Sequence, residues 1–208
     1  MFPGGKRSNQ QGMKTKNQSV KTMKSVVLMT LCAAPVVLLI GAAHSPSRSE
    51  TARIARGKYL VDYGGCNDCH TPLKMTDQGP QPDLGRMLSG HPETVELPPP
   101  ELKAGPWFAA TAGMTAWTGP WGISYASNLT PDTNTGMGIW TWEMFRKAMR
   151  TGKHMGDGRD ILPPMPWRSL KALSDEDLKA VFAYLRSIPP LSNRVPEPVG
   201  PKGPVSYQ

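Results

Sequence analysis

Apolar side chains recur at helical spacing in three stretches of the chain, residues 51–63, 141–151 and 174–188. A spacing of three or four residues places such side chains on one face of an α-helix. Two glycines follow the first stretch, one glycine follows the second and two prolines follow the third, and these residues commonly end helices. The pattern therefore predicts three helices, with a long region that lacks helical periodicity between the first two.

Each predicted helix has a set of apolar residues that we expect to face the core. The second and third helices also have typical N-terminal residues, because the side chains of Thr141 and Ser174 can accept hydrogen bonds from backbone N–H groups. Three acidic residues follow Ser174, at the helix end where negative charge is favourable. The expected apolar faces are Ala52, Ala55, Tyr59 and Leu60 in the first helix, Met144, Phe145, Ala148 and Met149 in the second, and Leu178, Val181, Phe182 and Leu185 in the third.

The first helix leads directly into the sequence Cys-Asn-Asp-Cys-His at residues 66–70. Two cysteines separated by two residues and followed by histidine have the spacing that attaches a c-type haem. The thiols of Cys66 and Cys69 can each add to one vinyl group of the porphyrin, while the imidazole of His70 points at the iron. Zinc sites and redox dithiols share the cysteine spacing, but Cys32 provides no second pair, and the strand and helix pattern around a redox dithiol is missing. We therefore expect one covalently attached haem c.

The region between the first two helices, residues 71–127, is rich in proline and glycine. It is longer than an ordinary connection, so we expect a long irregular insert. Its aromatic residues can cover one face of the haem in place of a helical core, or they can bind a partner. His91 in the insert is expected to be hydrogen-bonded or at the surface and not to bind the iron. The aromatic residues are Trp107, Phe108, Trp117, Trp121 and Tyr125.

The chain begins with a basic segment that is followed by an apolar one. Residues 1–24 carry six lysines and arginines and no acid, and residues 26–43 form an apolar run that ends in small residues. This order is typical of a secretory signal, although the apolar run also reaches the lower length limit of a membrane anchor. We therefore expect a signal peptide or N-terminal anchor at 1–43, a single haem domain at 44–190, and a proline-rich tail at 191–208 that wraps the domain or docks on another subunit.

The leader also changes the meaning of the net charge, which is +8 for the whole chain. Residues 44–208 carry 18 basic and 16 acidic side chains, so most of the positive excess lies in the leader. Because export explains a basic leader, the charge does not indicate nucleic-acid binding. Four basic residues lie on or just after the second helix, where a solvated face is the simpler interpretation and a partner-binding surface is the alternative. They are Arg146, Lys147, Arg150 and Lys153.

Several short segments resemble one family of cytochrome domains. They are Ser-Asn-Leu-Thr-Pro-Asp at 127–132, Thr-Gly-Met-Gly-Ile-Trp at 135–140 and Leu-Pro-Pro-Met-Pro-Trp at 162–167. Together they are similar to domains of the membrane-bound cytochrome c subunits of bacterial alcohol, gluconate and aldehyde dehydrogenases, over about residues 52–190. The resemblance implies an all-α fold like that of class I cytochrome c, with three to four helices around the haem and the first helix crossing the last. The residues that would allow their close approach are Gly57, Tyr59 and Leu60 on the first helix and Ala183, Tyr184 and Leu185 on the last. Those subunits typically carry three haem motifs, whereas this sequence contains one.

The second axial ligand of the iron must come from another part of the chain. Met165 lies between two prolines just before the last helix, and prolines on both sides restrict the backbone that presents its thioether. In the resembling family a Pro-Met-Pro segment supplies this ligand. We therefore expect His70 and Met165 to bind the iron, with Met155 and His154 as the alternatives to Met165.

These expectations describe an electron carrier and not an enzyme, because two axial ligands leave the iron no open site for a substrate. We expect a periplasmic cytochrome, soluble or anchored through residues 26–43 to the outer face of the inner membrane. It would pass single electrons from a dehydrogenase to an oxidase or another cytochrome of a respiratory chain. One alternative is a permanent cytochrome subunit of a membrane-bound dehydrogenase or respiratory complex. The other is a haem sensor or peroxidase-type enzyme with an open sixth position, for which His154, Arg159 and Asp160 would supply the polar residues.

Overall fold

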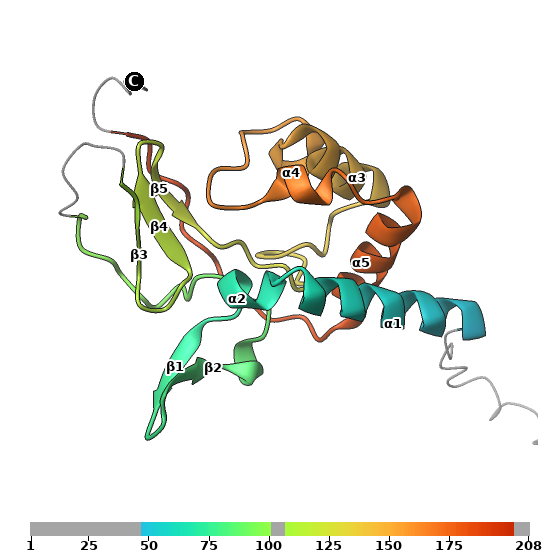
Figure 1. Ribbon diagram of the computed structural model, residues 1–208, viewed down its shortest axis with the longest axis horizontal. Coiled ribbons are helices and arrows are strands. Elements are labelled where there is room, and N and C mark those ends of the chain that lie inside the picture. Colours follow the sequence, from blue (N-terminus) through green and yellow to red (C-terminus); the bar gives the residue numbers. More distant parts are fainter. Residues whose placement is uncertain (1–46, 101–106, 202–208) are drawn as a thin grey trace, which may run out of the picture. The chain divides into compact units, whose positions relative to one another are not determined.

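The computed structural model describes residues 47–100 and 107–201, which lie in one compact unit of the chain, 46–208 (Figure 1). The expected leader with its apolar run at 26–43 lies outside the described residues, as does the end of the tail at 202–208. None of the helices in the described ranges combines the length and the hydrophobicity that are needed to cross a membrane.

Two helices meet at a pair of glycines just before the expected haem motif. α1 (Arg48–Tyr63) begins after Ser47, whose side chain accepts a hydrogen bond from the backbone N–H of Glu50, so it starts three residues earlier than predicted. α2 (Cys66–His70) follows almost at once and contains the whole motif. Gly65 has a φ of 65°, a left-handed conformation that glycine adopts without strain. This glycine lets the chain leave α1 and begin α2 within two residues.

The two later predicted helices begin and end where the sequence indicates. α3 (Trp142–Thr151) begins after Thr141, which caps it as expected, and it ends at a glycine in the left-handed conformation. α5 (Asp175–Ser187) begins after Ser174, which also acts as a cap, and it ends just before the two prolines. The short helix α4 (Trp167–Leu170) lies between them and was not predicted.

The insert contains five short strands in two antiparallel sheets, which the sequence analysis did not predict. β1 (Leu73–Thr76) pairs with β2 (Gly79–Pro82), while β3 (Ala109–Ala110), β4 (Ala116–Gly119) and β5 (Gly122–Tyr125) form a second sheet in that order. In this second sheet Ala109 pairs with Thr118, and Ala116 pairs with Tyr125. Two single turns of 3₁₀-helix, η1 (Leu84–Arg86) and η2 (His154–Gly156), complete the described elements. The fold is helix-rich but mixed, so the expected all-α class is confirmed only in part.

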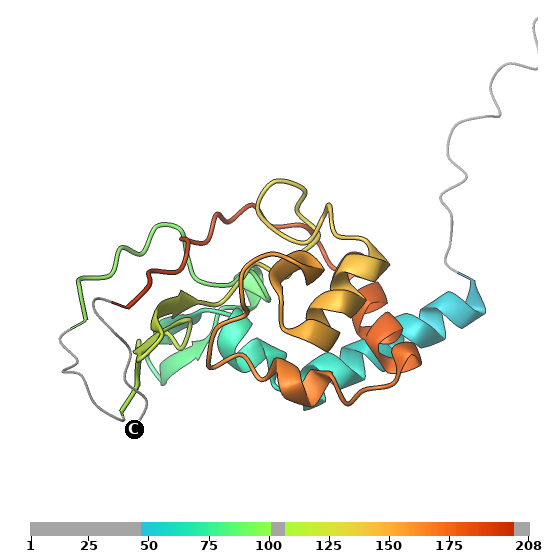
Figure 2. The same cartoon turned by 90° about the horizontal axis from the view of Figure 1, so that it is seen from above.

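The core forms where α1 crosses α5, and both views show the two helices in contact (Figures 1 and 2). Gly57 of α1 lies directly against the backbone of Ala180 and the side chain of Tyr184 on α5. The crossing expected from the cytochrome resemblance is therefore present. The buried apolar cluster around it consists of Val61, Leu88, Met137, Phe145, Ala148, Met149, Leu178, Val181, Tyr184, Leu185 and Ile188.

The predicted apolar face of α1 is wrong for three of its four residues, whereas Leu60 packs against the core. The predicted faces of α3 and α5 lie mainly in or against the core. Ala52, Ala55 and Tyr59 are exposed, and the buried residues of α1 are Gly57 and Val61. The reason is that α1 and α5 approach backbone to backbone at a glycine. The family resemblance indicated this close approach at Gly57, which is confirmed, but the spacing of apolar side chains could not, because glycine has no side chain.

The aromatic residues of the insert do not form one set with a shared environment. Trp117 is 5% exposed and belongs to the buried residues, whereas Trp107 is 75% exposed and Phe108 is exposed as well. His91 is buried, and its ring nitrogens bond the side chain of Thr115 at 2.9 Å and a backbone carbonyl at 3.1 Å. It is therefore a hydrogen-bonded residue, as expected.

After α5 the described part of the tail turns back and wraps the domain, which was one of the two alternatives that the sequence left open. In both views it runs from the end of α5 towards β5 (Figures 1 and 2). The backbone N–H of Leu191 donates to the hydroxyl of Thr130 at 3.0 Å, and Val199 pairs with Ile123 of β5. We call residues 189–199 the C-terminal strap.

We expect Gly57→Ala to lower the free energy of unfolding by about 1–3 kcal/mol, because the added methyl group would overlap the carbonyl of Ala180 and push α1 away from α5. Denaturant unfolding followed by circular dichroism measures this change. Gly113→Ala is the matched control, since its methyl group would meet only the hydroxyl of Thr115, at 3.7 Å. Equal stabilities of the two variants would contradict the close crossing.

Candidate haem site

His70, at the end of α2, is held with one ring nitrogen committed to a hydrogen bond. Its side chain is 7% exposed, and its Nδ1 lies 2.7 Å from the backbone carbonyl oxygen of Ser127. A carbonyl oxygen can only accept a hydrogen bond, so Nδ1 carries the proton and Nε2 carries the lone pair. Burial lowers the pKa of His70 and outweighs the hydrogen bond to Ser127, which acts to raise it. The lowered pKa keeps the ring neutral. A neutral imidazole with a free Nε2 is the form that binds iron.

The backbone around Ser127 is fixed by the segment that contains Gly90. The backbone N–H of Gly90 donates to the carbonyl of His70 at 2.8 Å, and that of His91 donates to the carbonyl of Ala126 at 2.9 Å. Gly90 has a φ of 80°, and a side chain there would overlap the backbone of Ser127. The peptide that orients the histidine ring is therefore packed tightly between two chain segments.

Cys66 and Cys69 lie on α2 with His70 and are half-buried free thiols. Burial raises the pKa of Cys66 to about 11, and burial together with the charge of Asp68 raises the pKa of Cys69. Reactive redox cysteines need a lowered pKa, so this environment does not favour a redox dithiol. A thioether carries no charge, and it tolerates burial against the apolar cluster that Cys66 contacts.

Met165 is half-buried on the segment that joins η2 to α4, and this segment is anchored at several points. The hydroxyl of Ser124, on β5, donates to the carbonyl of Pro163 at 2.6 Å and accepts a hydrogen bond from Nε1 of Trp121 at 3.2 Å. After Met165, the ring of Trp167 packs against Gly152 at the end of α3. The segment passes over α2 in Figure 2 and lies above it in Figure 1.

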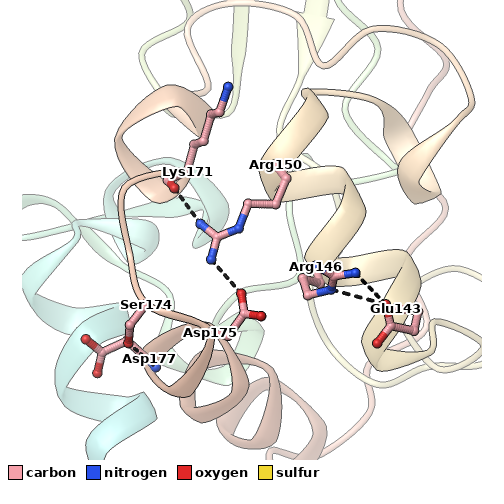
Figure 3. A network of polar contacts seen from close by, with 7 residues as sticks. All are labelled: Glu143, Arg146, Arg150, Lys171, Ser174, Asp175 and Asp177. Atoms are coloured by element: carbon pink, nitrogen blue, oxygen red, sulfur yellow. Dashed lines mark hydrogen bonds and ion pairs between the residues drawn. The ribbon is translucent and has the colours of Figure 1, made fainter.

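Arg150 ties the end of this segment to the neighbouring helices (Figure 3). From α3 its guanidinium donates to the backbone carbonyl of Lys171, just after α4, and to the carboxylate of Asp175 at 2.6 Å, at the start of α5. Figure 3 also shows the exposed pair of Arg146 and Glu143 on α3 alone. Arg150 therefore connects three helices, whereas Arg146 connects none.

Each of the four basic residues on or just after α3 lies beside an acid. This pairing supports the interpretation of a solvated helix face over a free basic surface for partners. The nitrogen to oxygen distances are 2.9 Å for Arg146 and Glu143, 3.4 Å for Lys147 and Asp157, 2.6 Å for Arg150 and Asp175, and 2.7 Å for Lys153 and Asp160.

The polar residues that a sensor or peroxidase would use have other partners. His154 meets the ring of Trp140 edge-on at 5.2 Å, and Arg159 pairs with Glu197 at 3.6 Å. Asp160 pairs with Lys153 and not with His154 or Arg159. His154 and Met155, the alternative ligands, both lie in the tight turn η2 that packs on α3.

The structure thus places Cys66, Cys69 and His70 on one helix, with the Met165 segment passing over it. These donors fit a covalent haem, because two thiols and a neutral imidazole with a free Nε2 are presented together. Sequence reasoning did not identify Ser127 as the partner of the histidine, since it contributes a backbone carbonyl that no residue pattern marks. It also missed Ser124, because a single serine between Ile123 and Tyr125 gives no clear signal.

Arg150 and Asp175 give a prediction about pH. The hydrogen bond from Arg150 lowers the pKa of Asp175 below its ordinary value of 3.8. A lowered folded-state pKa means that the pair stabilises the fold above about pH 3.8 and that this stabilisation is lost as the pH falls through the folded-state value. In a double-mutant cycle of Arg150→Gln and Asp175→Asn, we expect a favourable coupling energy near neutral pH that disappears in acid.

Unfolding measurements across the pH range would test this, with Arg146→Gln and Glu143→Gln as the control cycle. That pair lies within one exposed helix, so its coupling should be small at every pH. A coupling between Arg150 and Asp175 that grows as the pH falls would contradict the prediction.

No protein-family model matches the chain, but several known proteins do. One subunit of the nicotinate dehydrogenase of Pseudomonas putida is 40% identical over 145 residues, covering 70% of this chain and 9% of the relative. The cytochrome c subunit of the quinone alcohol dehydrogenase of Gluconobacter oxydans is 30% identical over 186 residues, covering 88% of this chain and 32% of the relative. The cytochrome c subunit of gluconate 2-dehydrogenase of Pantoea cypripedii is 30% identical over 162 residues, covering 78% of this chain and 28% of the relative.

The chain therefore spans about a third or less of the length of these relatives. A cytochrome subunit of a fructose dehydrogenase is similar as well, at 31% identity. The resemblance expected from the sequence is confirmed for the alcohol and gluconate dehydrogenases: over most of its length, the chain resembles a part of the cytochrome c subunits of bacterial dehydrogenases.

Proposed function

We propose that this chain is a c-type cytochrome that carries one haem and transfers single electrons. Cys66 and Cys69 attach the porphyrin through thioether bonds, and His70 and Met165 are the axial ligands. The observation that carries the proposal is the geometry of His70, whose ring is buried and held by Ser127 with Nε2 free. The similarity to cytochrome c subunits supports a haem c and an electron-transfer role.

When bound, the haem supplies an iron that alternates between two oxidation states. The chain's own residues hold the geometry constant in both states. The bond to Ser127 orients His70 and keeps its Nε2 basic. The bond from Ser124 to Pro163 anchors the segment that presents the soft thioether of Met165, a ligand type that raises the reduction potential.

The partners belong to the proposal as well. Relatives named as cytochrome subunits of alcohol, gluconate and fructose dehydrogenases support a dehydrogenase as the electron donor, in a lasting or a brief complex. A respiratory oxidase or another cytochrome is the acceptor. We place the protein in the periplasm or at the outer face of the inner membrane, with residues 1–43 as signal or anchor, 44–190 as the cytochrome domain and 191–208 as the tail.

Absorption spectra of the haem-loaded protein test this proposal. We expect haem to stay on the chain after denaturation, and the oxidised protein to show the weak red absorption band that a methionine sulfur gives to ferric haem. Met165→Ala should lose this band and bind carbon monoxide, whereas the wild type should not bind it. Met75→Ala is the control, because this side chain is 79% exposed on β1.

Three results would overturn the assignment. Loss of the band in Met155→Ala but not in Met165→Ala would move the ligand to η2. Carbon monoxide binding by the wild type would indicate an open sixth position, as in a sensor or peroxidase. Retention of covalent haem by a variant that lacks both Cys66 and Cys69 would exclude them as the attachment site.

Ser124→Ala tests how the Met165 segment is anchored. The substitution removes the hydrogen bond from Trp121 and the part-buried hydrogen bond to the carbonyl of Pro163. The bond to Pro163 holds the ligand segment and is worth about 1 kcal/mol, so imidazole should displace Met165 about fivefold more readily. Spectroscopic titration of the oxidised protein with imidazole measures this. Ser187→Ala removes a similar bond, from a hydroxyl to the carbonyl of Tyr184 within α5, and it should leave the titration unchanged. Equal titrations for both variants would show that Ser124 does not anchor the ligand segment.

A further inference from the structure

We propose that Asn193, on the C-terminal strap, is a positioning residue that fixes the backbone around His70 and thereby sets how strongly this histidine donates to the haem iron. The inference rests on the proposed function, since it requires His70 to be an iron ligand. It extends that function by giving the strap a role in setting the reduction potential.

Asn193 uses its whole side chain to bind a distant segment of the insert. It is 2% exposed, and its amide nitrogen donates to the backbone carbonyls of Ser89 at 2.7 Å and His91 at 2.8 Å. Its amide oxygen accepts hydrogen bonds from the guanidinium of Arg86 at 2.8 Å and from the backbone N–H of Glu93 at 3.0 Å. Two donors and two acceptor positions are thus all used, which is the full capacity of an asparagine side chain.

The two carbonyls that Asn193 binds lie on either side of Gly90. This glycine donates its backbone N–H to the carbonyl of His70 and packs against the backbone of Ser127, which accepts the hydrogen bond from the His70 ring. Asn193 therefore holds the segment around Gly90. This segment bonds the backbone carbonyl of His70, and it packs against Ser127, whose carbonyl accepts the hydrogen bond from the His70 ring.

A second asparagine fixes the strap from the other side. Asn128 follows Ser127 directly, and its amide nitrogen donates to the carbonyl of Leu191 on the strap at 2.8 Å and to the hydroxyl of Thr135 at 3.2 Å. Its amide oxygen accepts hydrogen bonds from the backbone N–H of Thr130 at 3.0 Å and from the hydroxyl of the same residue at 2.8 Å. Asn128 and Asn193 together connect the strap to both segments that hold His70.

The position of the Ser127 carbonyl has a direct chemical consequence. A strong hydrogen bond from Nδ1 makes the other ring nitrogen more basic, and a more basic ligand favours the oxidised iron. If the strap loosens, the Nδ1 bond lengthens, His70 donates less and the reduced form becomes relatively more stable. Loosening the strap should therefore raise the reduction potential.

Asn193→Ser in the haem-loaded full chain tests this inference without changing any charge. A serine is too short to reach both carbonyls, and it leaves room for water. We expect the ratio of reduced to oxidised protein at a fixed potential to rise about tenfold, equivalent to about 59 mV for one electron. A spectroelectrochemical titration measures the ratio, and the paramagnetically shifted NMR signals of the His70 ring protons should move as well. Asn128→Ser is the second variant, and it should change both readouts in the same direction.

Two control variants separate positioning from general stability. Asn134→Ser makes the same chemical change at an exposed residue and should leave the potential unchanged. Ser174→Ala removes the N-cap of α5, so it should lower the thermal midpoint without moving the potential or the histidine signals.

The possible failures can be told apart. If the wild type lacks the spectrum of a histidine and methionine ligated haem c, the proposed function and this inference both fall. If the wild type has that spectrum but both asparagine variants keep its potential and its histidine signals, only the inference is overturned. The same holds if Ser174→Ala shifts the potential as much as they do, because the effect would then reflect lost stability.

Discussion

The hydrogen bond between Nδ1 of His70 and the carbonyl of Ser127 is the interaction on which the rest of the site depends. It fixes the proton on one ring nitrogen and leaves the lone pair on the other, which is the form of histidine that the proposed role as an iron ligand requires. A backbone carbonyl can do this only if its peptide is held still. The insert and the C-terminal strap provide that support: Gly90 packs against Ser127, and Asn193 binds the backbone on both sides of Gly90.

The helices and the insert therefore contribute to the structure in different ways. α1, α3 and α5 supply most of the apolar core, and α1 crosses α5 at Gly57. The short helix α2 presents two thiols and an imidazole. The insert contains only short strands, but it supplies Ser127, which bonds His70, and Ser124 on β5, which anchors the Met165 segment. A long irregular segment is thus not merely a connection here, because both expected axial ligands are positioned by its hydrogen bonds.

The similarity to known cytochrome subunits extends over the helices and the insert alike. The similarity covers 88% of the chain in the cytochrome c subunit of Gluconobacter oxydans, which includes the insert as well as the helices. It covers only about a third of that relative, so the chain corresponds to a part of the larger subunit. Two of the polar residues considered for an open-site enzyme form ion pairs elsewhere: Arg159 pairs with Glu197, and Asp160 pairs with Lys153.

The sequence by itself determined the motif at residues 66–70, the caps at Thr141 and Ser174, and the helices that follow them, because these depend on neighbours within a few residues. It did not determine the buried face of α1, the strands of the insert or the course of the strap. The family resemblance indicated the close approach at Gly57, but Ser127 acts through a backbone carbonyl, which no pattern of side chains reveals. Asn193 contacts residues about a hundred positions away, and only the tertiary structure brings such partners together.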